Sequence, residues 1–340
     1  MDPRVSVIIC AYNGEKTIGR CIDSILNQDY DNYEIIVVND GSVDNTESIC
    51  KRYGDKIVYF RNKVNMGVAG ARNRGFTLAG GQYIAYTDSD CVAQKDWLST
   101  LIRYAVNNRV DVLGGTVLTP KDLNFFARCV GTLHKPGPIL KSENIAKDIP
   151  TANALFSKSL YRETKGFDET FRVSNEDTDL LIRMQLKGRK IHYEQRAKVY
   201  HYHKNNVHSF AKWRFDTGLG LCMLAKKYSF KVNRIYNLFN LALIPFILLV
   251  TLVSLIARPI ILPVGVLVLF LGQLTRNYIR DRDNFKFGEI LGGVLLGWLL
   301  RLVTSVGFYY GLLVLPKEHK AVHEIVSQKK SPGLRNVLFY

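Results

Sequence analysis

The chain has 340 residues, which is enough for one large domain or two smaller ones. Its six cysteines are scattered without any C-x-x-C spacing, which argues against a disulfide framework and indicates buried thiols in a reducing compartment. The formal net charge is +16, and much of it lies between Arg183 and Arg234, directly before a mostly apolar region over residues 236–315. This position favours attraction to anionic lipid headgroups over nucleic-acid binding.

The first ninety residues alternate between predicted strands and helices. Apolar runs predict strands over residues 5–10, 34–38, 56–60 and 82–87. Apolar or small residues at helical spacing predict helices over residues 15–29, from residue 44 onward, and over residues 67–79. The alternation predicts an α/β fold with a mostly parallel sheet flanked by helices. The first run has little polar alternation, which is typical of a strand buried on both faces.

Three polar loops follow strands of this predicted sheet. They carry Ala11-Tyr12-Asn13, Asp40-Gly41-Ser42 and Asp88-Ser89-Asp90. Because ligands of such sheets bind at the carboxyl ends of the strands, the three loops are expected to form one site. Asp88 and Asp90 can hold one divalent cation with hard oxygen ligands, which suits Mg²⁺ or Mn²⁺. The simpler alternatives are a surface loop with paired acids and, at Asp40-Gly41, an ordinary turn.

A second module is predicted over residues 150–204. Its strand-like runs cover residues 151–156, 191–193 and 197–201, and Glu176-Asp177 opens a helix. Acids in the first turn of a helix are favoured by its dipole, so Asp177 and Asp179 could serve that purpose alone.

The apolar region contains three candidate membrane segments, over residues 236–257, 259–274 and 288–315. Basic residues from Arg276 to Lys286 place the second loop on the cytosolic side, which fits a hairpin followed by a third segment. The basic tail over residues 316–340 would then lie on the wrong side if all three segments crossed. One of them is therefore expected to be re-entrant or to lie in the interface, and the sequence leaves open which.

The soluble part over residues 1–206 is expected in the cytosol, because the N-terminus carries no signal-peptide pattern. Residues 207–235 read as a basic amphipathic juxtamembrane segment. Within it, four apolar residues alternate with Lys212 and Arg214, which predicts a helix lying in the membrane interface. The four are Phe210, Trp213, Phe215 and Leu219.

Seven short motifs occur in one order over some two hundred residues. They are Val5-Ser6-Val7-Ile8-Ile9-Cys10-Ala11-Tyr12-Asn13, Val38-Asn39-Asp40-Gly41-Ser42, Asn65-Met66-Gly67-Val68-Ala69-Gly70-Ala71-Arg72-Asn73, Asp88-Ser89-Asp90, Gly166-Phe167-Asp168-Glu169, Glu176-Asp177 and Val199-Tyr200-His201. Taken together they resemble family 2 of the inverting nucleotide-sugar glycosyltransferases, whose fold is called GT-A. The resemblance covers residues 4–220.

The resemblance implies a role for each motif. A UDP- or GDP-sugar would be bound by Ala11, Tyr12, Asn13, Asp40, Arg72, Asn73, Asp88, Ser89 and Asp90. Asp40 would hydrogen-bond the base, and Asp88 would lie near the ribose. Asp90 would bind Mg²⁺ or Mn²⁺, with Asp88 and His201 completing the metal site and His203 as the alternative histidine.

The acceptor side of the site is implied by the Glu176-Asp177 pair. Asp177 would be the general base on the acceptor hydroxyl, with Glu176 beside it, because a hydroxyl is a poor nucleophile until a base takes its proton. Lys212-Trp213-Arg214 only faintly echoes the Gln-x-x-Arg-Trp motif of the processive synthases in this family. Three apolar segments are also few for a polysaccharide channel, which favours transfer of a single sugar.

These observations predict an enzyme of the cell membrane, anchored by a hairpin or by several spans. Its acceptor would be lipid-linked: a polyprenyl or dolichyl phosphate, or a lipid-linked glycan. The alternatives are a chain-elongating synthase of exopolysaccharide or capsule, and a catalytically inert membrane adaptor, which the intact Asp88, Asp90 and Asp177 disfavour. A nucleotidyltransferase is a weaker possibility, since no Gly-rich phosphate loop follows the first strand.

Overall fold

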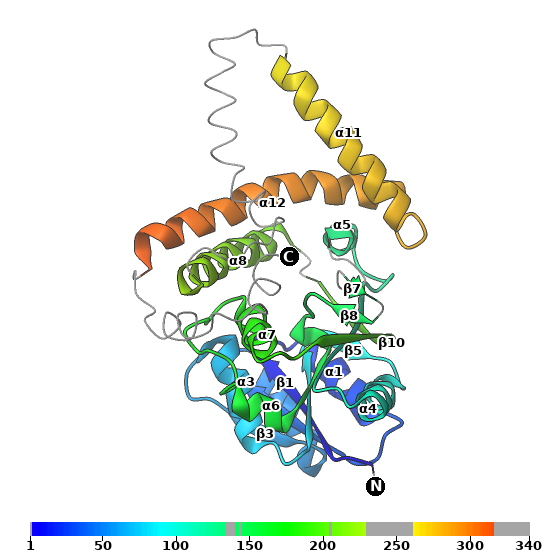
Figure 1. Ribbon diagram of the computed structural model, residues 1–340, viewed down its shortest axis with the longest axis vertical. Coiled ribbons are helices and arrows are strands. Elements are labelled where there is room, and N and C mark those ends of the chain that lie inside the picture. The colour runs from blue at the N-terminus through cyan, green and yellow to red at the C-terminus, as the bar shows by residue number, and fades with distance from the viewer. Residues whose placement is uncertain (1, 134–139, 143, 204–205, 229–260, 316–340) are drawn as a thin grey trace. The chain divides into compact units, whose positions relative to one another are not determined.

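The computed structural model describes residues 2–133, 140–142, 144–203, 206–228 and 261–315. They form two compact units, one from residues within 1–120 and 135–202, the other from residues within 121–134 and 203–340. The second unit therefore takes a short segment from the middle of the chain, which the boundary predicted at residue 206 did not include. Figure 1 shows the elements of both units.

The first unit contains one ten-stranded sheet with helices on both faces. Its strands are β1 (Val5–Ala11), β2 (Tyr33–Asn39), β3 (Val58–Arg61), β4 (Tyr83–Asp88), β5 (Cys91–Ala93), β6 (Val112–Leu118), β7 (Leu140–Ser142), β8 (Ile145–Ala146), β9 (Ala154–Ser157) and β10 (Ile191–His201). Its α-helices are α1 (Ile18–Leu26), α2 (Thr46–Lys51), α3 (Gly67–Leu78), α4 (Trp97–Asn108), α6 (Lys158–Glu163) and α7 (Glu176–Leu186).

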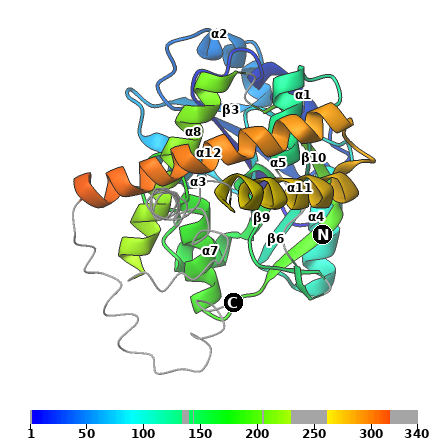
Figure 2. The same ribbon diagram turned by 90° about the horizontal axis from the view of Figure 1, so that it is seen from above.

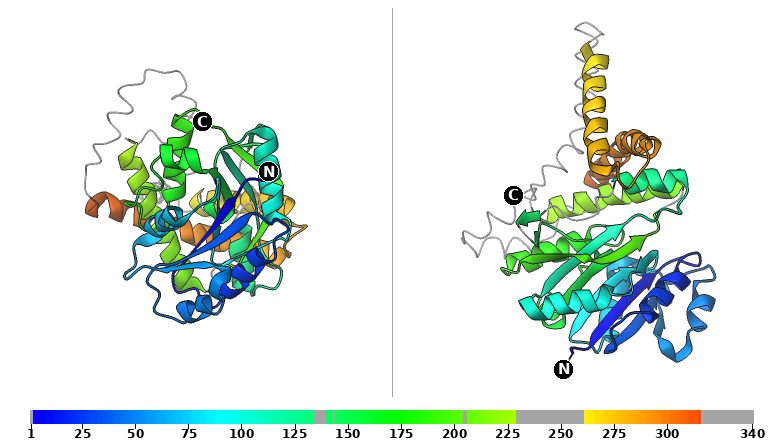
Figure 3. Two further views of the ribbon diagram at one scale, coloured as in Figure 1. Left: turned by 90° about the horizontal axis from the view of Figure 1, so that it is seen from below. Right: turned by 90° about the vertical axis from the view of Figure 1, so that its right-hand side faces the viewer.

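The sheet has the order β3-β2-β1-β4-β9-β6-β10-β8-β7, with β5 paired to β10. Strands β3, β2, β1 and β4 are parallel, which confirms the pattern expected from the alternating first ninety residues. Beyond them the sheet is mixed, because β9 runs antiparallel to both β4 and β6. Figure 3 shows the strands side by side in two further views.

Several elements of the second half of this unit differ from the sequence expectation. Residues Thr151–Asn153 form a 3₁₀ turn, and β9 begins only at Ala154. The reason is the side chain of Asn153, which is buried and donates to the carbonyl oxygens of Thr116 and Ala197, each at 3.0 Å. The two strand-like runs near residue 195 join into the single strand β10, with an irregular register between Glu194 and Lys198.

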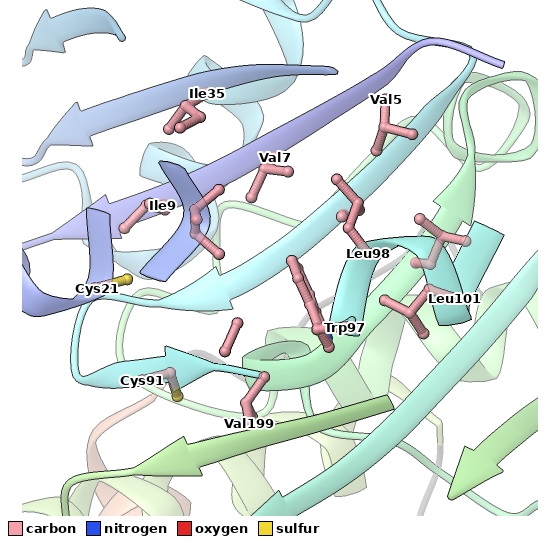
Figure 4. Packing of buried hydrophobic residues seen from close by; sticks show 14 of the residues in the cluster. Val5, Val7, Ile9, Cys21, Ile35, Cys91, Trp97, Leu98, Leu101 and Val199 are labelled. Carbon is pink, nitrogen blue, oxygen red and sulfur yellow. The ribbon is translucent and has the colours of Figure 1, made fainter. Parts of the chain in front are cut away.

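Strand β1 lies at the centre of the core and is buried on both faces, as its apolar run predicted. Val5, Val7 and Ile9 pack on the side of α1 and α4, as Figure 4 shows, whereas Ile8 belongs to the apolar cluster on the opposite face of the sheet. A strand enclosed in this way is fixed in register, so the loop at its end is held in place.

The second unit consists of α5 (Phe125–Leu133), α8 (Val207–Lys227), α11 (Ile261–Asp281) and α12 (Phe287–Val314) in the described residues. Figure 2 shows α12 running past α5 and α8. Within the described residues, α12 is the one helix long and apolar enough to cross a membrane by length and composition. A buried core helix can pass the same test, so composition alone does not assign it to the bilayer.

Two expectations for this region need correction. Phe210 on α8 is 1% exposed and packs with Val130 of α5, so its ring is buried inside the protein and does not face lipid. Helix α11 continues to Asp281, which places Arg276 and Arg280 on a helix and not in a loop. The predicted segment 236–257, residues 229–235 and the tail over residues 316–340 lie outside the described residues.

Candidate functional site

The three predicted loops leave neighbouring strands at one edge of the sheet. In the register of the sheet, Ala11 of β1 pairs with Asn39 of β2, and Cys10 pairs with Asp88 of β4. Strand β1 therefore has the end of β2 on one side and the end of β4 on the other. This is the position at which open α/β sheets bind their ligands, outside the carboxyl ends of the strands.

Hydrogen bonds join the loop after β1 to the loop after β2. The Asp40 amide donates to the Ala11 carbonyl oxygen at 2.8 Å, and the Asn13 amide donates to Ser42 Oγ at 2.9 Å. Asn13 adopts a left-handed conformation with φ of 52°, which its short polar side chain tolerates. Tyr12 stays 53% exposed, so the fixed loop presents a free aromatic ring at the edge of the sheet.

Asp40 is buried and organises the neighbouring loop. Its carboxylate accepts hydrogen bonds from Asn62 Nδ2 at 2.7 Å, from the Met66 amide at 2.9 Å and from the Gly67 amide at 3.0 Å. The last two amides lie at the start of α3, where the helix dipole favours a negative charge. The structure gives Asp40 this stabilising role, and its contact with a nucleotide base stays a prediction. Sequence reasoning missed Asn62, for which the chain offers no motif.

Arg72 links two motifs that are distant in the sequence. It lies on α3 and is 5% exposed. One guanidinium nitrogen donates to Asp88 Oδ1 at 3.0 Å, and the other donates to Glu176 Oε1. The guanidinium also lies over the ring of Phe167, 5.4 Å from its centroid. Arg72 therefore joins the end of β4 to the beginning of α7.

Glu176 and Asp177 stand at the N-terminus of α7 and differ in exposure. Glu176 is buried, and its second oxygen, Oε2, has no hydrogen-bond partner among the described residues. Asp177 is only partly buried, and its Oδ1 accepts the amide hydrogen of Thr178 at 2.7 Å. Burial raises the pKa of both carboxyl groups above their usual range, while the positive charge of Arg72 opposes the rise. Of the two, Asp177 is the more exposed to solvent.

Asn73 organises the turn that precedes α7. Its Nδ2 donates to the carbonyl oxygen of Phe167 and to Glu169 Oε1, each at 2.9 Å, and its Oδ1 accepts from Tyr161 Oη and from the Phe167 amide. Gly166 has φ of 68°, and a Cβ there would lie 2.6 Å from Asn73 Oδ1. The Asn73 amide is thus engaged within the protein, and direct nucleotide binding by this residue stays a prediction.

Asp90 lies beside His201, as the metal-site hypothesis requires. His201 Nε2 is 3.2 Å from Asp90 Oδ1, and both side chains are about one-fifth exposed, at 23% and 19%. Antiparallel pairing of β5 with β10 places His201 opposite Cys91, so the histidine reaches the residue just before it. His203, the alternative, belongs to the second unit.

The donor set of this group fits a hard divalent cation. A carboxylate oxygen of Asp90, an imidazole nitrogen of His201 and Cys91 Sγ all lie within 4.8 Å of one another. Burial raises the pKa of the Cys91 thiol far above its usual range, with the charges of Asp90 and Asp88 adding to the effect. A protonated thiol is a poor metal ligand, which leaves one oxygen and one nitrogen donor, a pair suited to Mn²⁺ or Mg²⁺. Asp88, whose Oδ1 is engaged by Arg72, stands at the other end of the same loop.

Comparison with known proteins agrees with this geometry. The family model described as "Glycosyl transferase family 2" matches residues 6–165. An uncharacterized glycosyltransferase of Haemophilus influenzae is 31% identical over 224 residues, which cover 61% of this chain and 68% of that protein. The putative glycosyltransferase EpsE of Bacillus subtilis is 32% identical over 193 residues, covering 55% of this chain and 68% of EpsE.

A solved structure shares the fold. The mannosyltransferase PcManGT from Pyrobaculum calidifontis, in complex with GDP-Man and Mn²⁺, superimposes with a TM-score of 0.53 at 15% sequence identity, covering 99% of this chain and 79% of that chain. The mixed sheet with helices on both faces is accordingly a GT-A fold. From its sequence relatives and its fold together, the chain belongs to glycosyl transferase family 2.

Proposed function

We propose that the protein is a membrane-bound, metal-dependent, inverting glycosyltransferase that moves one sugar from a UDP- or GDP-sugar to a lipid-linked acceptor. The observation that carries the proposal is the position of Arg72, whose guanidinium touches both Asp88 and Glu176. One buried cation thereby holds together the loop expected at the donor and the helix that carries Asp177, the expected base. Asp88 and Glu176 would not need to share one cation if each had only a separate structural role.

The donor would occupy the edge of the sheet beside β1. The exposed ring of Tyr12 is placed to stack on a nucleotide base, and stacking does not distinguish uracil from guanine. Asp90 and His201 would hold Mg²⁺ or Mn²⁺, which neutralises the charge on a leaving nucleoside diphosphate when it is bound. Asp88, fixed by Arg72, would orient the ribose.

Asp177 would activate the acceptor. Its carboxylate takes the proton of an acceptor hydroxyl, the hydroxyl oxygen forms a bond to the anomeric carbon, and the bond to the nucleoside diphosphate breaks on the opposite face. This single displacement inverts the anomeric configuration. A raised pKa makes the carboxylate a stronger base than an ordinary aspartate, which suits this step.

The acceptor chemistry follows from the need for a base. A polyprenyl or dolichyl phosphate is already ionised at neutral pH and needs no proton removed, whereas the hydroxyl of a lipid-linked glycan does. A base role for Asp177 would therefore favour the glycan hydroxyl within the lipid-linked class. The membrane part of the proposal is supported by the apolar segments over residues 236–315 and by the basic stretch that precedes them.

A transfer assay tests the proposal. Membranes that contain wild-type protein or Asp177→Asn receive Mg²⁺ or Mn²⁺ and a panel of radiolabelled UDP- and GDP-sugars, and label is counted in the organic-solvent extract. Label from one donor that is absent with Asp177→Asn is the expected result. Equal label with the variant would identify a phosphate acceptor and remove the base role.

Two other outcomes would replace the lipid acceptor. Label confined to long polymer would identify a chain-elongating synthase, and label confined to short water-soluble glycan would identify a soluble acceptor. Failure of every nucleotide sugar to bind, measured by isothermal titration, would indicate an inert adaptor and overturn the enzymatic proposal as a whole.

A further inference from the structure

Helix α12 has two apolar faces that serve different purposes. A helix turns by about 100° per residue, so five exposed large apolar residues of α12 fall within about 80° of one another around the axis, while Phe287 and Val314 at its two ends lie to either side of them. They are Leu295, Leu302, Val306, Tyr310 and Leu313, with exposed fractions of 56%, 40%, 47%, 50% and 86%. We call this line of residues the outer stripe. The opposite face carries Ile290, Gly307 and Phe308, which are buried.

The buried face of α12 packs on α5 and α8 along most of its length. Near its N-terminus, a Cβ on Gly293 would lie 2.8 Å from the Cys129 carbonyl oxygen of α5. Near its C-terminus, Gly307 lies directly against the backbone of Phe215 on α8, and Lys226 Nζ donates to the Leu315 carbonyl oxygen at 2.7 Å. Close backbone approach of this kind fixes the helices to one another.

A buried ion pair fastens the beginning of α12. Arg128 of α5 donates from Nε and Nη2 to the two carboxylate oxygens of Glu289 at 3.0 and 2.9 Å. Nη2 also donates to the Asn284 carbonyl oxygen at 2.7 Å. The turn between α11 and α12 is therefore held against α5, a helix that the chain enters from β6 and leaves toward β7.

This packing argues against a membrane-spanning α12. The contacts at Gly293 and Gly307 are fourteen residues apart, or about 21 Å along the axis. If α12 crossed a hydrocarbon core of about 30 Å, α8 would have to accompany it through the core. Helix α8 carries Lys212, whose side chain is 69% exposed, paired with the partly buried Asp216, and charged residues at the bilayer centre cost about 2.5–3.5 kcal/mol each even on the translocon-insertion scale.

We propose that α12 lies in the plane of an anionic membrane surface, with its outer stripe in contact with acyl chains and its other face on α5 and α8. The occupant of the stripe is argued from charge as well as apolarity. Exposed cations Arg276, Arg282 and Lys286 lie at the end of α11 and in the turn that leads into α12, with Asp283 as the exposed acid among them, so lipid phosphates would meet a net positive charge there. The proposal rests on the membrane attachment in the proposed function and adds the topology.

An in-plane α12 resolves the topology conflict predicted from the sequence, in which three crossings would place the basic tail on the side opposite the cytosol. Of the three candidate segments predicted from the sequence, those over residues 236–257 and 259–274 are then left as the candidates to cross. An even number of crossings returns the chain to the cytosolic side before α12. The basic tail, with Lys317, Lys320 and Arg335 among its cations, then lies where the positive-inside rule places it.

Depth measurements in lipid nanodiscs test this orientation. Single nitroxide labels are introduced into the full chain at Leu295→Cys, Leu302→Cys and Leu313→Cys, and oxygen and a water-soluble nickel chelate report the depth of each label. An in-plane helix gives the same shallow depth at all three positions. A spanning helix would separate the first and the last label by about 27 Å along the membrane normal and place the middle one deepest, which would overturn the proposal.

Matched controls keep the readings separate. Lys212→Cys, on the exposed side of α8, should report the aqueous or headgroup region. The wild-type chain sets the labelling background, since its native cysteines are buried or half-buried. Low access to both reagents along the outer stripe would mean that a second copy of the chain covers it, and this outcome also overturns the proposal.

A second measurement distinguishes failure of the topology from failure of the proposed function. Lys320→Cys is treated with a membrane-impermeant maleimide in right-side-out and inside-out vesicles, and we expect labelling in the inside-out vesicles alone. Labelling of right-side-out vesicles would overturn the in-plane helix while leaving sugar transfer intact in the same sample. Water-like depth at every stripe position, with the protein released from membranes by salt, would overturn membrane attachment in both proposals.

Discussion

Each of the two units contains a buried Arg–Glu ion pair, and the two pairs are built differently. In the second unit, Arg128 meets both oxygens of Glu289, and the Lys286 amide adds a further hydrogen bond at 2.8 Å. In the first unit, Arg72 divides its donors between Glu176 and Asp88, and Glu176 Oε2 lacks a partner within the described part of the chain. The Arg128–Glu289 pair therefore satisfies its carboxylate oxygens more fully than the Arg72–Glu176 pair does.

The difference separates a structural ion pair from one beside a reaction centre. A fully satisfied buried pair fixes helices in one arrangement. Its carboxylate stays ionised, because burial opposes but does not prevent the lowering of the Glu289 pKa by Arg128. A cation shared among acids holds those acids close together, so the charge of each acid affects the pKa of the others. The same two residue types thus hold α5 to α12 in one unit and connect the donor loop to the expected base in the other.

The largest effect is expected from Asp177→Asn, which changes the acid next to the shared cation without touching the pair itself. We expect loss of transfer by about 10²–10⁴-fold, the usual contribution of a general base, with donor affinity retained. Initial rates and isothermal titration with the donor measure the two effects. Glu163→Gln, an exposed acid paired with Lys187, is the matched control and should keep full activity. Loss of donor affinity in Asp177→Asn would show that the role is wrong.

Removal of either arginine sharpens the comparison next. Arg72→Met and Arg128→Met each leave buried acid without its cation, which typically costs about 3–5 kcal/mol of stability and should lower the melting temperature in detergent. Arg128→Met should keep its kcat and KM per folded molecule, whereas Arg72→Met should raise KM for the donor and lower kcat. An Arg72→Met protein with unchanged kinetics would remove Arg72 from the site.

Double variants separate stability from function in these proteins. Arg128→Met combined with Glu289→Leu should recover much of the lost stability, since buried pairs are often replaceable by apolar residues. Arg72→Met combined with Glu176→Leu should recover stability but not transfer, because Asp88 remains without its cation. Recovery of transfer in the second combination would contradict the positioning role.

A smaller effect is expected from neutralising the acids alone. Glu289→Gln converts a bidentate, charge-assisted interaction and should cost about 1.5–3 kcal/mol, the usual worth of a hydrogen bond to a charged group. Glu176→Gln should cost less, because only one of its oxygens is bonded among the residues that the structure describes and burial already raises the pKa of the carboxyl group. Thermal unfolding of both variants tests the order, and the reverse order would mean that the two pairs are equivalent.

The smallest effect is a shift in the pH profile. Because the pKa of Asp177 is raised, transfer should fall as the pH drops through a value above the ordinary aspartate range, where protonation removes the base. Loss of the positive charge at Arg72, which opposes the rise, should move this acid limb to higher pH, whereas Arg128→Met should leave it in place. The profile of kcat/KM at saturating metal measures the shift, and an acid limb unaffected by Arg72→Met would argue against electrostatic coupling.

The parallel half of the sheet was predictable because its signals are local. Continuous apolar runs such as residues 5–10 and loops such as Asp88-Ser89-Asp90 carry their meaning within a few positions. The elements between residues 91 and 133 were not predicted. One reason is β6, where Gly114 and Gly115 weaken the strand pattern, although a Cβ at Gly115 would lie 2.5 Å from Asn153 Nδ2 and no larger residue fits.

The site residues divide along the same line. The sequence pointed to Asp88, Asp90 and His201, and the fold brings Asp90 beside His201 through the pairing of β5 with β10. It did not reveal that Asn73 is engaged by a turn or that Asn62 supports Asp40, since these contacts join residues that no spacing rule relates.

By itself, the amino-acid sequence determined the α/β class, the loops that carry the acids, the family and the apolar C-terminal region, because periodicity and short motifs report what a residue does within its own element. Only the tertiary structure decided that Arg72 joins Asp88 to Glu176, that Phe210 faces protein, and that α12 is fixed along α5 and α8. The physical reason is that an ion pair or a helix contact depends on which distant segments meet. An apolar composition suits a helix that crosses a membrane and equally suits a helix that lies against the membrane surface.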